Sequence, residues 1–289
     1  MPDFLSRQEH LSTVGSTNDV VREWLDAGTS EVCLVDADEQ LAGRGRDGRT
    51  WQAPRGAALL LSLGFRPRWL APERVWQLAA TVSLAMADAA EVATGLPLGT
   101  IRLKWPNDLA IEWANGSSGA STPGSAAGHA STGDPRVRKV AGVLGETDGL
   151  GTDDPRAIIG IGVNVDWAAD EFPRDLAGSM TSLSEATDGR RVDRAALLAE
   201  FVPRLEGRVV ALRSGRFDGR GWQDRQATTG RVVDVLGADG ETTSRHATGV
   251  DTETGALIVD DPESPTGERR FVVGEITHVR LAPPVAGGV

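Results

Sequence analysis

Residues Gly43–Trp51 read GRGRDGRTW, a run of three arginines and three glycines that ends on a tryptophan. Arginine presents a rigid fork of donors that suits phosphate and carboxylate groups. Glycine lets the backbone approach a ligand closely, but it loses the most entropy when a loop becomes ordered. This composition fits a loop that becomes ordered over an anionic ligand. It fits equally a solvated basic turn or an Arg-Gly segment that binds nucleic acid.

Four other short segments accompany this loop. Lys104–Asp108 reads KWPND, Lys139–Glu146 reads KVAGVLGE, Ile158–Val165 reads IIGIGVNV, and Ser16–Asn18 reads STN ahead of them all. In order and spacing these segments resemble the biotin protein ligases, which activate biotin with ATP and attach it to a carrier protein. The resemblance covers nearly the whole chain, and the glycine-arginine loop is its most specific element.

Hydrophobic periodicity predicts an α+β layer. A first helix is expected to begin at a cap on Ser16 or Thr17 and to end at Gly28, and two longer helices are expected at 72–94 and 191–213. Apolar runs predict strands at residues 31–37, 57–65, 100–104 and 109–113. The resemblance implies that these elements build a mixed-sheet catalytic domain of the biotin/lipoate ligase type.

The pattern changes after about residue 222, where short apolar runs alternate with glycine turns. Such runs occur at 230–236, 246–250, 256–259 and 270–273 and predict a small barrel. The resemblance implies a catalytic domain at residues 1–221 and an SH3-like β-barrel at 222–289. Only 15 residues precede Ser16, too few for a winged helix-turn-helix, so the chain resembles the monofunctional class of ligases.

Residues 114–133 differ from the rest of the chain. They carry no charge and consist almost entirely of Ala, Gly, Ser, Thr and Pro. A segment of this kind lacks the apolar side chains that form a core. It falls where the ligase family has a short turn, and we interpret it as a flexible, neutral insertion.

Bulk composition excludes several classes of function. The formal net charge of −11 and the pI near 4.9 oppose nonspecific binding to DNA or RNA, which requires a basic surface. Cys33 is the only cysteine, so neither a disulfide framework nor a thiolate metal cluster is expected. The chain shows neither a signal peptide nor an apolar run near ~18 residues. We therefore expect a soluble cytoplasmic protein with no DNA or membrane partner.

Biotin combines an apolar ring system with a polar ureido group and a carboxylate, so its pocket needs an apolar wall and a few directed polar groups. The resemblance places the ureido group near the side chains of Ser16, Thr17, Asn18 and Gln40. It places the backbone of Gly43 and Arg44 along the valerate tail, and adds Arg46, Lys139 and Gly142 to the biotin site. Considered alone, Ser16 and Thr17 are better explained as helix caps and Gln40 as a surface residue; the accompanying motifs favour the ligand role.

The resemblance also implies how ATP binds and reacts. In this family the lysine of the Lys-x-x-Gly segment lies by the reacting carboxylate and the α-phosphate. The corresponding residue here, Lys139, is our first catalytic candidate, and Arg46 is the second. Both would act electrostatically, because charge builds on phosphate oxygens in the transition state. The candidate ATP and adenylate contacts are Arg46, Arg49, Trp51, Lys104 and Asn164.

The metal ligands stay open at this stage. ATP is expected with Mg²⁺, and Asp108 either pairs with Lys104 to brace the site or helps to hold the metal. We favour the ion pair with Lys104, because a single carboxylate supplies too few protein ligands for a magnesium site. The four histidines show no ligand spacing. Asp47 departs from the family, where a basic or neutral residue is commoner, and it offsets part of the loop's positive charge.

Two alternatives remain from the residues alone. A lipoate or octanoate ligase on the same fold is the nearer one, and the complete glycine-arginine loop argues against it. A noncatalytic Arg-Gly nucleic-acid binder is the other, and the acidic net charge argues against that. The resemblance therefore implies a biotin–protein ligase whose partners are biotin, ATP and the biotin carboxyl carrier domain of a carboxylase.

Overall fold

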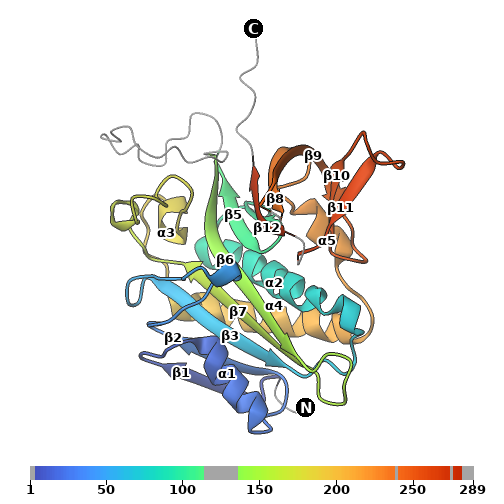
Figure 1. The fold of residues 1–289 in the computed structure, drawn as a ribbon. Coiled ribbons are helices and arrows are strands. Elements are labelled where there is room, and N and C mark those ends of the chain that lie inside the picture. Colours follow the sequence, from blue (N-terminus) through green and yellow to red (C-terminus); the bar gives the residue numbers. More distant parts are fainter. Residues whose placement is uncertain (1–3, 114–135, 238–239, 274–275, 282–289) are drawn as a thin grey trace.

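The computed structural model describes residues 4–113, 136–237, 240–273 and 276–281. Two β-sheets, one large and one small, account for most of its strands (Figure 1). The proposed insertion at 114–133 lies outside the described residues. In the described part of the chain, no helix combines the length and apolar character needed to cross a membrane.

The larger sheet has seven strands and is mixed, as predicted. Its order is β1-β2-β3-β7-β6-β5-β4; β1 and β2 pair in parallel, and all other neighbours are antiparallel. The strands are β1 (Arg7–Leu11), β2 (Cys33–Ala37), β3 (Ala58–Phe65), β4 (Ile101–Lys104), β5 (Asp108–Glu112), β6 (Val137–Asp148) and β7 (Arg156–Asn164).

Helices cover both faces of this sheet. Alternate residues of β2 belong to different clusters: Leu34 packs into the main core with α2 (Trp76–Thr94) and α4 (Arg194–Arg213), whereas Cys33 packs with α1 (Thr17–Asp26). Because successive strand side chains point to opposite faces, α1 lies on the face opposite α2 and α4. Figure 1 shows α2 and α4 side by side behind the strands.

The smaller sheet is antiparallel throughout, in the order β11-β10-β9-β8-β12. Its strands are β8 (Val232–Gly237), β9 (Thr242–Val250), β10 (Leu257–Asp260), β11 (Glu268–Phe271) and β12 (Ile276–Leu281). The indole of Trp105 donates across to Gly255 O at 2.9 Å, so the sheets contact each other. The domain boundary predicted at 221/222 falls within α5 (Gly219–Asp224); that boundary and the SH3-like description stay predictions.

Local chemistry explains where the elements differ from the expectation. Ser16 occupies the N-cap of α1, as predicted, but its side chain accepts no capping hydrogen bond. The helix expected from residue 191 begins at Arg194, because Asp193 caps it by accepting from Ala195 N at 2.9 Å. The region from residue 72 starts with a 3₁₀ turn before α2. Sequence reasoning missed the edge strand β1, whose polar residues follow no apolar run.

Candidate active site

A cavity of about 630 Å³ lies on the α1 side of the large sheet. Its walls come from the start of α1, the glycine-arginine loop, β4 to β7, a segment around residue 179 and the end of β12. Twelve of the predicted site residues line it: Ser16, Thr17, Asn18, Gln40, Arg44, Arg46, Arg49, Trp51, Lys104, Lys139, Gly142 and Asn164. Gly43 does not; it lines a neighbouring groove of about 490 Å³. The cavity has the size of a small-molecule site.

Hydroxyl and amide groups form a connected polar cluster in this cavity. Gln40 Oε1 accepts from both the backbone nitrogen and the hydroxyl of Thr17, at 2.8 and 2.9 Å. Ser62, which is fully buried, lies 2.7 Å from Thr17 Oγ1 and donates to Asn18 Oδ1 at 2.6 Å. Since each side chain is held by its neighbours, the cluster is preorganised. Ser62 was missed from sequence because it sits inside an apolar run.

The glycines of β7 make room for protein side chains. A Cβ on Gly160 would overlap the side-chain oxygen of Asn18, and a Cβ on Gly162 would lie 2.6 Å from the Trp51 indole. In this structure Asn18 and Trp51 fill the space, and they form part of the cavity wall.

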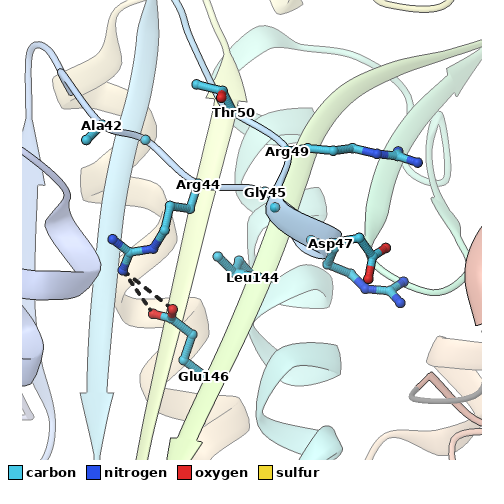
Figure 2. Close-up of a pocket in the computed structure, with 11 residues that line it drawn as sticks. Ala42, Arg44, Gly45, Asp47, Arg49, Thr50, Leu144 and Glu146 are labelled. Carbon is cyan, nitrogen blue, oxygen red and sulfur yellow. Dashed lines mark hydrogen bonds and ion pairs between the residues drawn. The ribbon is translucent and has the colours of Figure 1, made fainter.

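Arg44 is committed to protein carboxylates (Figure 2). Its guanidinium binds Asp19 with two hydrogen bonds of 2.8 and 2.7 Å and lies 3.5 Å from Glu146. The hydrogen bond from Arg44 is the main reason why the pKa of Asp19 is lowered. The Arg44 guanidinium is thus paired within the protein, and the position of its backbone along the cavity is compatible with the predicted tail contact.

Arg46 points to a different part of the molecule. Its Nη2 donates to Val273 O at 3.1 Å, just beyond β11 of the small sheet. Burial is the main cause that lowers its pKa, and the charge of Asp47 acts in the opposite direction. Asp47 itself adopts a left-handed φ of 56° and is exposed. The negative charge of Asp47 thus favours the charged form of Arg46.

Two lysines converge on one carboxylate in the cavity. Lys139 Nζ lies 2.7 Å from Asp108 Oδ1, and Lys104 Nζ lies 3.8 Å from Asp108 Oδ2. The pKa of Lys104 is lowered chiefly by burial, and the nearby Lys139 adds to the effect. The bracing role predicted for Asp108 is supported, with Lys139 as a closer partner than Lys104. Among the described residues, no group of three His, Cys, Asp or Glu side chains is placed to hold a metal ion.

A β-bulge explains the Lys-x-x-Gly spacing. Leu109 pairs with Ala141 while Ala110 pairs with Lys139, which leaves Val140 as an extra residue. Residues three apart on a regular strand face opposite sides, and the extra residue cancels that difference. Lys139 and Gly142 therefore share the cavity face, where a Cβ on Gly142 would lie 2.9 Å from Lys139 Nζ.

Several buried polar atoms in the cavity wall lack a protein partner. Asn164 donates through Nδ2 to Thr181 O at 2.9 Å, but its Oδ1 has no partner among the described residues. The indole nitrogens of Trp51 and Trp167 are likewise unpaired within that part of the chain. Such buried groups are costly unless they are satisfied, so a polar ligand in the cavity is a physical expectation.

Other cavity residues were not found from sequence. Arg280 reaches the cavity from β12, and Trp167, Leu176, Ser179 and Met180 reach it from the segment after β7. Sequence patterns give little indication of these residues, because the residues lie in irregular segments or in β12, a strand that hydrophobic patterning did not predict. Only the folded arrangement of both sheets brings Arg280 near Lys104.

The model of the Biotin/lipoate A/B protein ligase family matches residues 12–164, more than half of the 289-residue chain. The chain belongs to this family.

Named relatives agree with that assignment. The bifunctional ligase/repressor BirA of Bacillus spizizenii is 31% identical over 203 residues, which cover 69% of this chain and 54% of that protein. The chain thus spans about half the length of that relative. The biotin–[acetyl-CoA-carboxylase] ligase of Mycobacterium tuberculosis is 29% identical over 93% of this chain and 88% of its own length. The Aquifex aeolicus biotin protein ligase solved with biotin and ATP superimposes with a TM-score of 0.72 at 25% identity, over 96% of this chain and 99% of that one.

Proposed function

We propose that this chain is an ATP-dependent biotin–protein ligase. In the first step a carboxylate oxygen of biotin attacks the α-phosphorus of ATP, which forms biotinyl-5′-AMP and releases pyrophosphate. In the second step the amine of a carrier-domain lysine attacks the acyl carbon, an amide bond forms, and AMP leaves. The named relatives and the solved neighbour with biotin and ATP support this reaction.

The observation that carries the proposal is the arrangement of the cavity along β7. The polar cluster abuts Gly160 through Asn18, and Trp51 with Lys139 abuts Gly162 and Gly142. Two residues along one face of a strand span ~7 Å. A ureido group at the cluster would thus leave the acid chain of biotin directed along β7 toward Lys139.

Each cation then has a role in bringing two anions together. Lys139, held by Asp108 at 2.7 Å, stabilises the reacting carboxylate and the charge that develops on the α-phosphate. Lys104, Arg46 and Arg49 bind the phosphates. Trp51 and Asn164 contact the adenylate. Asn164 Oδ1, which has no partner in the described part of the chain, is available to accept from an amino or hydroxyl group of the nucleotide.

Magnesium enters this scheme as part of the substrate Mg-ATP. Asp108 is engaged by two lysines, and the described residues supply no other cluster of carboxylates for a resident ion. We therefore assign no protein ligand for the metal. The reaction is placed in the cytoplasm, because it consumes ATP and because the only cysteine, Cys33, is free and buried.

A comparison of three acids tests the proposal. The purified chain is incubated with Mg-ATP, a biotin carboxyl carrier domain, and either biotin, lipoate or octanoate, and the carrier mass is measured. We expect a mass increase with biotin alone, because only biotin has a ureido group for the cluster at Thr17 and Gln40. The Lys139→Ala variant is the negative control. Modification by lipoate or octanoate in place of biotin would contradict the proposal.

A further inference from the structure

The backbone around Lys139 is held by a segment other than β7. β7 ends at Asn164, and Met180 then forms a parallel bridge with Lys139. Lys139 N donates to Ser179 O and Thr181 N donates to Lys139 O, both at 2.8 Å. Asn164 Nδ2 donates to Thr181 O at 2.9 Å. The segment Ser179–Thr181 therefore continues the sheet at the point where the bulged strand carries Lys139.

A buried ionic network lies on the other side of this segment. Arg138 Nη1 lies 2.8 Å from Glu185 Oε1, and the two side chains are 16% and 10% exposed. The hydroxyl of Thr181, a fully buried residue, donates to Glu185 Oε2 at 2.7 Å. The backbone nitrogen of Glu185 is itself held by Ser182 Oγ at 3.1 Å, which caps the short helix α3 (Leu183–Ala186).

Strand geometry links this network to the cavity. Arg138 and Lys139 are adjacent on β6, so their side chains point to opposite faces, and Arg138 packs over the Trp113 ring at 4.8 Å. Glu185 thus pairs with Arg138, which precedes Lys139, and with Thr181, whose backbone amide binds the Lys139 carbonyl. The bulge at Val140 makes this stretch of β6 irregular, and an irregular backbone needs such outside contacts to keep one conformation.

We propose that Glu185, acting through Arg138 and Thr181, is a positioning residue that sets the direction of Lys139. This inference rests on the proposed function, because Lys139 matters there as the group at the reacting phosphate. Glu185 is not among the residues that line the cavity. Loss of the carboxylate frees Thr181 and Arg138 together, so Lys139 samples directions that no longer match the transition state.

Steady-state and single-turnover kinetics of adenylate formation test the proposal with Glu185→Ala and the isosteric Glu185→Gln. We expect kcat to fall about 10- to 100-fold in Glu185→Ala, as expected for a misplacement near ~1 Å, with KM for biotin within about twofold. Glu185→Gln, which still accepts from Thr181, should recover part of kcat. Glu200→Ala, which removes a carboxylate paired with Arg204 inside α4, is the matched control and should retain kcat.

A double-mutant cycle separates positioning from a general structural effect. If Glu185 acts through Lys139, Glu185→Ala should change kcat less than twofold in the Lys139→Ala background. An equal fall of kcat in both backgrounds would overturn the inference. If Glu185→Ala does not fold, Glu185→Gln and Thr181→Val run the same cycle. Wild-type protein that forms no adenylate would instead refute the proposed function itself.

Discussion

At the scale of single residues, Val140 and Gly142 determine where the Lys139 side chain lies, which the spacing of the Lys-x-x-Gly motif alone does not show. The bulge at Val140 turns Lys139 and Gly142 to the same face, and Gly142 leaves the space that the ammonium group occupies. Asp108 then holds that ammonium at 2.7 Å. The Lys-x-x-Gly pattern is thus a geometric requirement of a bulged strand beside a cavity.

Lys139→Ala should slow adenylate formation by two to three orders of magnitude while biotin still binds. A single preorganised charge at a transition state contributes about 3–4 kcal/mol, and the lysine has little to do with the ring system of biotin. Single-turnover formation of biotinyl-AMP and calorimetric biotin binding check the two halves. Near-normal adenylation in this variant would show that Lys139 is not a catalytic residue.

Gly162→Ala should displace the Trp51 indole and raise KM for ATP several-fold. The new Cβ would lie 2.6 Å from the ring, which is too close for any side chain. Gly145→Ala is the matched control on the neighbouring strand, because its Cβ meets Ile159 at an ordinary 3.5 Å. KM for ATP, measured for both variants beside their melting temperatures, should separate them. Equal behaviour of the two variants would show that the Gly162 space is not used in this way.

At the scale of elements, the glycine-arginine loop is anchored on both of its flanks. On one side Arg44 joins β6 through Glu146 (Figure 2) and α1 through Asp19. On the other side Arg46 reaches Val273 O beyond β11. Within the loop, Gly45 N donates to Arg49 O at 2.7 Å. The loop therefore connects the two sheets across the cavity. A ligand bound in the cavity can shift the loop toward its ordered conformation.

Trypsin should cut the ligand-free loop after Arg46 and Arg49, and biotin with ATP should protect it. Ligand phosphate and carboxylate offset the entropy of fixing the loop glycines. Arg46→Ala should consequently release adenylate into solution faster than it weakens biotin capture. Protease mapping and adenylate release without carrier are the measurements. Equal cleavage with and without saturating ligands would exclude this role of the loop.

The edge strand β1 carries a pH-dependent contact. His10 Nδ1 lies 2.6 Å from Asp36 Oδ2 on β2, and His10 Nε2 lies 3.6 Å from Asp38 Oδ2. The hydrogen bond to Asp36 is the main cause that raises the pKa of His10 above 6.5, while burial and Arg194 oppose it. Because the folded-state pKa is the higher one, the stabilisation is fully present below the unfolded pKa and is lost as pH rises through the folded value.

His10→Asn should therefore lower the melting temperature by roughly 1–2 °C at pH 5.5 and have little effect at pH 8.5, a small change because the histidine is largely exposed. Melting curves across this pH range check the prediction. Asp36→Asn should remove the same pH dependence. A His10→Asn effect that grows with pH would contradict the assigned direction.

At the scale of the whole molecule, the sequence predicted features that are encoded in short segments, but it did not predict contacts between residues far apart in the chain. Periodicity found α2 and α4, and motif order found the cavity residues, because each signal lies within a short segment. The partners of Arg44 lie 25 and 102 residues away, and Arg280 enters from the second sheet. No local pattern encodes such contacts. The edge strand β1 was missed for a related reason, since an exposed strand needs no apolar run.

A crystal structure with biotin and a nonhydrolysable ATP analogue would show how both substrates lie in the cavity. We expect the ureido group at Thr17 and Gln40, and the biotin carboxylate within hydrogen-bond reach of Lys139 Nζ beside the α-phosphate. Asn164 Oδ1, unpaired among the described residues, should accept a hydrogen bond from the nucleotide. Biotin bound in the reverse direction, or nucleotide at the polar cluster, would contradict the account.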